Sequence, residues 1–216
     1  MRVLLITQGV SRVVLPLLES SHHFVGILES APRGYKQKHT KKLLILVRRI
    51  VGLIKRASPS LKQLAKQKGV PYRFMTSSND DGLETWVKEK DPDVIVVFSM
   101  SQLLKPNIFS IPKQGSINLH TAYLPEYRGP NPDFWQYFHM EMNPGVTVHY
   151  VDAGEDTGDI IVQERVEIPL GIKSPDRLDM LVGKVGVRLI LEALEQIESG
   201  TVARKRQPKE SPTQRA

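Results

Sequence analysis

The feature of this sequence that most constrains the fold is a continuous apolar run, Val94 to Phe98, which follows Asp93. A strand without polar alternation is typically buried on both faces, as in a parallel sheet covered by helices. Residues 2–7, 24–28, 72–74 and 116–120 form further strand-like runs, and segments with helical spacing lie between several of them. This alternation predicts the α/β class, with a doubly wound, mostly parallel twisted sheet and helices on both faces.

The second half of the chain adds a different pattern. Residues 145–151 and 160–166 are strand-like and are joined by an acidic, glycine-rich segment. They predict an antiparallel pair of strands added to the sheet, with their connecting loop facing the carboxyl end of residues 116–120. Ser174-Pro175-Asp176 opens a final helix that reaches about Glu198, where Ser199-Gly200 stops it. We therefore predict one domain over residues 1–200.

Composition narrows the available chemistry. The 216 residues include no cysteine, which excludes disulfides, thiolate zinc sites and a cysteine nucleophile. The first apolar run is too short for a signal peptide, so we expect an unexported, cytoplasmic protein without a transmembrane segment. Residues 201–216 are basic and polar with two prolines, and we expect this tail to be disordered.

The net charge of +7 is unevenly distributed. Residues 31–79 contain thirteen Lys or Arg and no Asp or Glu. Within them, residues 43–54 are largely apolar but shorter than the ~20 residues that a membrane-spanning helix needs. Three interpretations remain open for this segment: peripheral contact with a membrane surface, a wall for a phosphorylated or nucleic-acid ligand, or a solvated helix face packed on its own domain. An apolar face here can also pack on a second subunit, as in a homodimer.

Three polar residues stand next to apolar runs and form a candidate catalytic trio. Asn118 and His120 lie two apart on a predicted strand, so their side chains share one face. Asp156 lies in the glycine-rich connection that we expect to face them. An amide, an imidazole and a carboxylate can stabilise an oxyanion and move a proton. The alternative is that His120 is a structural hydrogen-bonding residue.

These residues belong to spaced motifs that occur in a fixed order: Asn118-x-His120, Tyr123-Leu124-Pro125-x-Tyr127-Arg128-Gly129, Gly145-Val146-Thr147 and Asp152-x-Gly154-x-Asp156-Thr157-Gly158-Asp159-Ile160. The order resembles the 10-formyltetrahydrofolate-dependent formyltransferases, which include glycinamide ribonucleotide, methionyl-tRNA and sugar N-formyltransferases. The resemblance covers residues 93–166 and implies a Rossmann-like formyltransferase domain.

The resemblance implies a role for each member of the trio. Asn118 and a protonated His120 would donate hydrogen bonds to the oxyanion formed when an amine attacks the formyl carbon. Asp156 would hold His120 in its cationic form and relay the proton of the amine. The formyl donor would be 10-formyltetrahydrofolate, and no metal is required. The Leu124-Pro125 bond corresponds to one that is commonly cis in the family.

The same resemblance implies a pterin pocket built from two segments. Its residues would be Met100, Gln102, Leu103, Leu104, Asp152, Ala153, Gly154 and Glu155. Core packing is an equal alternative for Leu104, and a turn carboxylate is an equal alternative for Asp152.

Departures from the family pattern direct the prediction of the acceptor. The turn after the first strand, residues 7–12, lacks the Gly-Ser-Asn loop that holds a phosphate in glycinamide ribonucleotide enzymes. From the single predicted domain we expect neither the C-terminal β-barrel of methionyl-tRNA enzymes nor the N-terminal domain usual in deformylases. Residues 130–135 resemble the Asn-Pro and aromatic segment of sugar N-formyltransferases, although Trp135 can be ordinary core.

We therefore predict a nucleotide-linked amino sugar as the acceptor and expect no nucleic-acid partner. The alternatives are hydrolysis of 10-formyltetrahydrofolate, formylation of methionyl-tRNA or glycinamide ribonucleotide, and a non-catalytic folate-binding or RNA-binding module.

Overall fold

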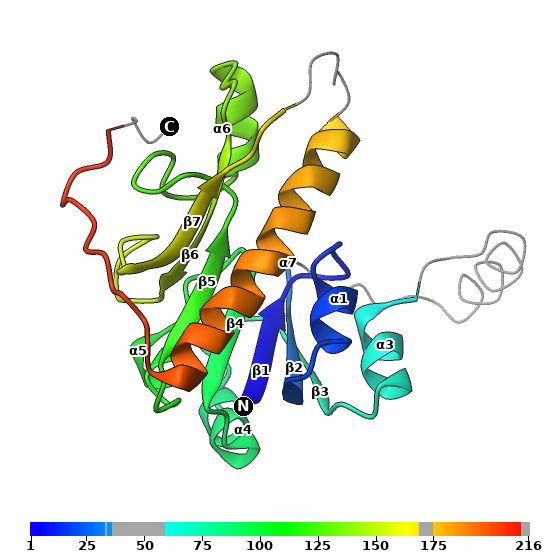
Figure 1. Ribbon diagram of the computed structural model, residues 1–216. Coiled ribbons are helices and arrows are strands. Elements are labelled where there is room, and N and C mark those ends of the chain that lie inside the picture. The colour runs from blue at the N-terminus through cyan, green and yellow to red at the C-terminus, as the bar shows by residue number, and fades with distance from the viewer. Residues whose placement is uncertain (33, 36–58, 169–174, 213–216) are drawn as a thin grey trace, which may run out of the picture.

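A computed structural model describes residues 1–32, 34–35, 59–168 and 175–212. Its sheet consists of seven strands in the order β3-β2-β1-β4-β5-β6-β7 (Figure 1). The strands are β1 (Arg2–Thr7), β2 (His23–Ser30), β3 (Tyr72–Met75), β4 (Val94–Phe98), β5 (Ser116–His120), β6 (Gly145–Tyr150) and β7 (Ile160–Arg165). The first five are parallel, and β6 and β7 are each antiparallel to the preceding strand. This confirms the predicted fold class, including the added antiparallel pair.

Helices cover both faces of the sheet. They are α1 (Val14–Leu18), α3 (Leu61–Gln67), α4 (Leu83–Lys90), α5 (Pro106–Phe109), α6 (Pro132–Phe138) and α7 (Pro175–Ser199). One hydrophobic core joins α1, α3 and α7 to the sheet, and the other joins α4 and α5 to the opposite face. In Figure 1, α7 crosses the strands beside α1.

The apolar run of β4 packs into both cores, as its sequence predicts. Val94 and Val96 belong to the α1/α7 core, and Ile95 and Val97 belong to the α4/α5 core. All four side chains are buried. Because β4 lies between β1 and β5, it places the carboxyl end of β5 beside those of the central strands.

The C-terminal segment, residues 201–212, differs from the predicted disordered tail. After α7 the chain turns at Gly200, which has a φ of 70°. Lys205 then forms a β-bridge with Ile160 at the start of β7, with backbone hydrogen bonds of 2.8 and 2.9 Å. The polar composition that suggested disorder instead supplies hydrogen bonds to two loops of the domain.

Residues 33 and 36–58 of the basic region, which include residues 43–54, lie outside the described residues, as do the membrane and subunit contacts suggested for them. Within the described residues, no helix is long and apolar enough to cross a membrane.

Candidate active site

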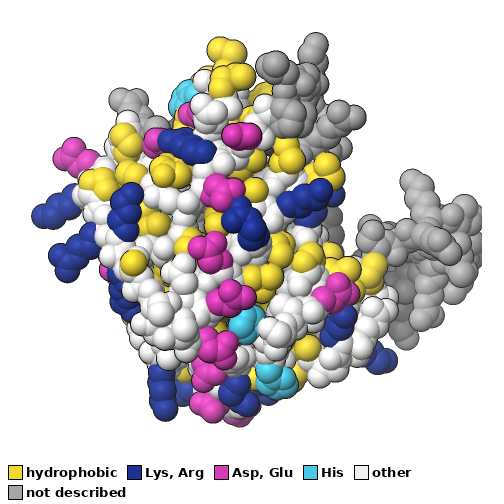
Figure 2. All heavy atoms as spheres, in the orientation of Figure 1, with side chains coloured by type: hydrophobic (Ala, Val, Ile, Leu, Met, Phe, Trp, Pro, Cys, Tyr) yellow, Lys and Arg dark blue, Asp and Glu magenta, His cyan; other side chains and the backbone are white. Residues whose placement is uncertain are grey.

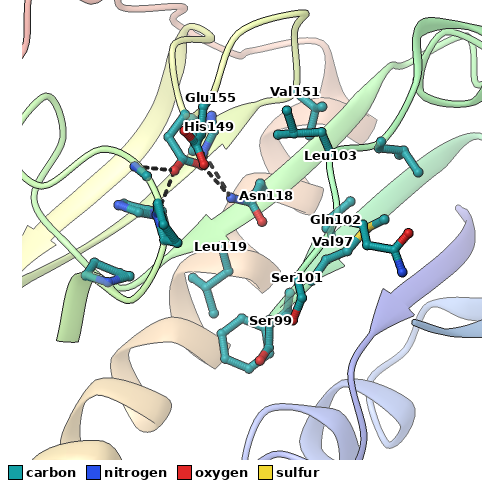
Figure 3. Close-up of a pocket in the computed structure, with 18 of the residues that line it drawn as sticks. Val97, Ser99, Ser101, Gln102, Leu103, Asn118, Leu119, His149, Val151 and Glu155 are labelled. Atoms are coloured by element: carbon teal, nitrogen blue, oxygen red, sulfur yellow. Dashed lines mark hydrogen bonds and ion pairs between the residues drawn. The ribbon is translucent and has the colours of Figure 1, made fainter. Parts of the chain in front are cut away.

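The site begins with a polar face on β5. Asn118 and His120 share one face of the strand, while Leu119 packs into the α1/α7 core on the other. Figure 3 shows Asn118 on the side of His149, and Leu119 on the opposite side of the strand. The alternation of side chains along a strand dictates this arrangement. The structure therefore places the Asn118 and His120 side chains together, as predicted.

The neighbouring strand β6 extends this polar face. In the antiparallel register, His149 lies opposite Asn118 and Thr147 lies opposite His120. Directly opposed residues point to the same face of a sheet. His120, His149 and Thr147 are buried, with exposed fractions of 5, 2 and 0%. The sheet thus presents two buried imidazoles and one amide on one surface.

Asp156 comes from the β6–β7 connection, which folds back over this face. Its Oδ2 lies 3.4 Å from His120 Nδ1, and its Oδ1 lies 3.4 Å from His149 Nε2. Asn118 donates from Nδ2 to Oδ1 at 3.2 Å. The carboxylate is therefore the point at which all three side chains converge, and the predicted trio meets.

The loop at residues 121–130 closes the site from another side. The backbone amide of Gly129 donates to Asp156 Oδ2 at 2.9 Å, and His120 Nε2 contacts the carbonyl oxygen of Tyr127 at 2.8 Å. Tyr127 and Asp156 both have a φ of 53°, in the left-handed region. The Leu124-Pro125 bond in this loop is cis, as the family resemblance implies.

The hydrogen bonds assign protons to both imidazoles. A carbonyl oxygen only accepts, so His120 Nε2 donates to Tyr127 and His149 Nδ1 donates to the carbonyl of Tyr150 at 2.8 Å. His149 Nε2 can then accept from Asn118 Nδ2, which lies 3.2 Å away. His120 Nδ1 is left facing Asp156, so this nitrogen and the carboxylate are placed to share a proton.

Burial and charge set the titration of the pair. Burial lowers the pKa of His120, while the charge of Asp156 acts in the opposite direction. Burial also acts to raise the pKa of Asp156, but His120, His149 and the Gly129 amide together outweigh it and hold that pKa well below its usual range. The expected cationic His120 is thus not favoured before substrates bind, because desolvation dominates.

His149 is the residue that the sequence reasoning missed. Residues 146–149 alternate apolar and polar, which puts Thr147 and His149 on one face. Pairing this alternation with Asn118-x-His120 on an adjacent antiparallel strand would have brought His149 to the site. That pairing depends on a register that the sequence alone did not supply.

A cavity of about 480 Å³ opens beside the trio. All eight predicted cofactor residues line it: Met100, Gln102, Leu103, Leu104, Asp152, Ala153, Gly154 and Glu155. Leu103 is 63% exposed, whereas Leu104 lines the cavity and also packs into the α4/α5 core. Leu104 thus packs in the core and also borders the cavity, and its contact with the cofactor stays a prediction.

Two of these side chains are engaged with the protein itself. Gln102 Oε1 accepts from the Ser78 amide at 2.8 Å, which links the loop after β4 to the loop after β3. Asp152 Oδ1 accepts from the Gly154 amide at 3.0 Å and from Thr157 Oγ1 at 2.7 Å, which is a turn arrangement. The described part of the chain contains no cluster of three or more His, Cys, Asp or Glu suited to a metal ion.

Comparison with known proteins decides the family. The formyl transferase family model matches residues 49–194, which is more than half of the 216 residues. This chain belongs to the formyl transferase family. The resemblance stated from the motifs is thereby confirmed at the level of the family.

Curated relatives of this formyl transferase chain include the methionyl-tRNA formyltransferase of Clostridioides difficile (strain 630). It is 35% identical over 144 residues, which are 67% of this chain and 46% of that protein. The chain thus spans about half the length of such relatives. Their name includes a tRNA, so they do not support the expectation that nucleic acid plays no part.

Solved structures of related fold come from other branches of the family. Phosphoribosylglycinamide formyltransferase from Streptococcus pneumoniae TIGR4 has a TM-score of 0.67 and 20% identity, covering 91% of this chain and 98% of that one. The formyltransferase PseJ from Anoxybacillus kamchatkensis has a TM-score of 0.53 and 20% identity, covering 98 and 84%. At these identities the likeness establishes the shared fold.

Proposed function

We propose that this formyl transferase chain moves the formyl group of 10-formyltetrahydrofolate to a primary amine. The observation that carries the proposal is the Asp156 carboxylate, which contacts Asn118, His120 and His149 on a buried face that opens into a cavity. An amide, two imidazoles and a carboxylate provide both hydrogen-bond donors and a proton acceptor at one point.

The formyl donor, when bound, supplies an activated carbonyl group. Asn118 and His120 are assigned to donate hydrogen bonds to the oxygen on which negative charge develops. In that role the Asn118 amide exchanges its bond to Asp156, and His120 Nε2 its bond to the Tyr127 carbonyl, for the substrate oxygen. Asp156, kept ionised by its neighbours, accepts the proton that the attacking amine loses. Asp156 Oδ2 and His120 Nδ1 are 3.4 Å apart and can pass this proton to the folate nitrogen, which takes it as its bond to the formyl carbon breaks.

The cavity wall suits a flat, polar ring system. Residues 100–104 and 152–155 border the cavity, and Leu104 contributes an apolar side chain. A pterin edge alternates hydrogen-bond donors and acceptors, so backbone groups match it without any charged side chain. These residues fit the cofactor assigned to them from the sequence.

A nucleotide-linked amino sugar remains our first candidate for the acceptor. Residues 129–133 line the cavity, and α6 continues from them with aromatic side chains that face solvent. Phe134, Tyr137 and Phe138 are 56, 69 and 64% exposed, and Figure 2 shows hydrophobic side chains gathered where α6 lies at the top of the view. Exposed aromatic rings beside a cavity can stack on a nucleobase. PseJ, which shares the fold, is described in complex with a UDP-linked formamido sugar and tetrahydrofolate.

Methionyl-tRNA is the second candidate, because curated relatives at 35% identity act on it by name. The same aromatic surface suits the unpaired acceptor end of a tRNA, whose bases can stack on it. The two candidates differ in size and charge, so one assay separates them.

The test is formyl transfer by the purified chain, with 10-formyltetrahydrofolate and either amino-sugar nucleotides or methionyl-tRNA. We expect one acceptor class to gain the mass of one formyl group. A reaction without amine measures formate release, which would instead indicate the hydrolase. If His120→Ala kept most of the transfer to a good acceptor, the assigned mechanism would be wrong. Binding of tRNA that disappears at physiological salt would count against the second candidate.

A further inference from the structure

The C-terminal segment, residues 201–212, lies against the two loops that complete the candidate site. It leaves α7 at Gly200, bridges to β7 through Lys205 and Ile160, and continues past residues 125–129. Figure 1 shows it as the orange to red chain along the β7 edge of the sheet. Near its end, Ser211 Oγ donates to the carbonyl of Pro125 at 2.8 Å.

Arg128 anchors one of these loops to the segment. Its guanidinium is buried, with an exposed fraction of 6% for the residue. It donates to Gln207 Oε1 from Nε at 3.0 Å and from Nη2 at 2.8 Å. It also donates to the backbone carbonyls of Pro208 at 2.8 Å and Lys209 at 3.2 Å. A buried guanidinium needs such acceptors, so the segment satisfies a charge inside the loop.

Gln207 connects the same point to the other loop. Its Nε2 donates to the carbonyl oxygen of Asp156 at 3.1 Å and to that of Gly158 at 2.6 Å. The acceptor end of one side-chain amide therefore binds Arg128, while its donor end binds the backbone that carries the candidate catalytic carboxylate. One residue spans the gap between the two loops.

The geometry at that gap matters for the reaction. The Gly129 amide, next to Arg128, donates to Asp156 Oδ2 at 2.9 Å, and Tyr127 accepts from His120. Both Tyr127 and Asp156 hold left-handed backbone conformations, which persist only when surrounding contacts enforce them. Contacts across the loops are therefore needed to keep the carboxylate and the imidazole in register.

We propose that Gln207 is a positioning residue for the reaction, which joins Arg128 to the Asp156 loop and so fixes the Asp156 carboxylate against the Gly129 amide and His120. The expected effect on kcat rests on the proposed function, formyl transfer. The proposal extends that function to a segment that touches neither the cavity nor the trio side chains.

The experiment compares three variants of the full chain: Gln207→Leu, Gln207→Glu and Lys209→Ala. Gln207→Leu removes both halves of the connection. Gln207→Glu keeps an acceptor for Arg128 but places oxygen against the carbonyls of Asp156 and Gly158. Lys209→Ala is the control, because its exposed side chain is replaced while its carbonyl still accepts from Arg128.

We expect Gln207→Leu to lower kcat by about 10- to 100-fold, the size of effect that a small misplacement of reacting groups produces. KM for either substrate should change by less than about threefold, because no cavity contact is lost. Gln207→Glu should match the wild-type thermal midpoint through its pair with Arg128, yet keep the low kcat. Lys209→Ala should retain wild-type values.

If Gln207 had a purely structural role, Gln207→Glu would have both the wild-type thermal midpoint and the wild-type kcat. That result, or a folded Gln207→Leu with wild-type kcat, would overturn the proposal.

An NMR titration of the His120 imidazole without substrates gives a readout independent of turnover. We expect the His120 pKa in Gln207→Leu to lie closer to the ordinary 6.5, because water enters between the loops. An unchanged titration would count against the positioning role even if the wild-type chain showed no formyl transfer.

Discussion

The two oxygens of Asp156 have different partners. Oδ1 faces Asn118 and His149, and Oδ2 faces His120 and the Gly129 amide. Each oxygen therefore links one part of the polar face to another, and His120, His149 and the Gly129 amide lower the pKa of the carboxylate. Neutralising this carboxylate removes both a proton acceptor and the group that orients the imidazoles.

We expect Asp156→Asn to lower kcat/KM for formyl transfer by about 10³-fold, within the range attributed to positioned acid or base groups. The matched control is Asp159→Asn, three residues along the same loop, which should stay within about threefold of wild type. Steady-state kinetics with a saturating acceptor measure both. Comparable losses in the two variants would show that the loop, rather than the Asp156 carboxylate, is responsible.

His149 offers a second test at the level of one residue. Its Nε2 accepts from Asn118 and also faces Asp156. His149→Phe keeps an aromatic ring but removes that acceptor, so we expect kcat to fall about tenfold as Asn118 loses its orientation. His149→Gln can still accept from Asn118 and should recover part of the loss. Equal kcat values for the two variants would contradict an orienting role.

The family resemblance implied the trio residues, and strand parity and a glycine-rich turn gave local signals that agree with it. Asn118 and His120 were placed on one face by their spacing alone. His149 was missed because its position depends on the register between two strands. The charge of His120 was misjudged for a related reason: burial lowers its pKa, and burial is a property of the assembled face.

The β6–β7 connection contains two glycines whose replacement meets different obstacles. A Cβ on Gly158 would overlap the carbonyl oxygen of Tyr150 and lie 2.8 Å from its carbonyl carbon, both backbone atoms. A Cβ on Gly154 would instead overlap Oγ1 of Thr157, a side-chain atom that can rotate away. The same substitution thus meets a rigid obstacle at one glycine and a movable one at the other.

We expect Gly158→Ala to lower the free energy of unfolding by about 2–4 kcal/mol, as for other overpacked buried positions. Gly154→Ala should cost about 1 kcal/mol, the hydrogen bond between Thr157 and Asp152. Urea denaturation followed by circular dichroism gives both values. The structural account fails if Gly154→Ala proves the more damaging of the two.

Most elements could be predicted because their signals are local. The apolar run of β4, the helix opened by Ser174-Pro175 and the strand pair at residues 145–166 all fold close to the expected bounds. The C-terminal segment could not be predicted in this way. Its order comes from hydrogen bonds with Arg128 and Ile160, which are distant in sequence, and its polar composition carries no trace of them.

For the whole molecule, the buried site couples stability to pH. His120 has a folded pKa below its ordinary value of 6.5, so between those two values the unfolded chain binds more protons than the folded one. Stability must then fall as the pH drops below 6.5. Asp156 adds a further loss below its ordinary 3.8, because its folded pKa is also lowered.

Urea denaturation from pH 7 to 5 should therefore show a decreasing free energy of unfolding. His120→Gln removes one titrating group and should reduce the slope by at most about 1.4 kcal/mol per pH unit. The slopes are compared rather than the absolute stabilities, since the substitution itself disturbs packing. Identical slopes would mean that His120 titrates alike in the folded and unfolded states.

The acceptor is the property of the whole molecule that its sequence leaves least determined. The motifs that define the family lie in residues 93–166 and concern the formyl donor and the trio. In our proposal the amine binds beside α6, whose exposed aromatic rings suit more than one nucleotide-containing partner. The residues that shape such a surface follow no fixed spacing in the sequence, so no motif predicts the acceptor.

Asp156 receives contacts from β5, the loop at residues 121–130, β6 and, through its own carbonyl, Gln207. These segments span some ninety positions of the chain, counted from Asn118 to Gln207. A partly folded chain can have native helix content and still lack one of them. Catalytic turnover should consequently report complete assembly of the domain, and a destabilised variant should lose activity before its circular dichroism changes.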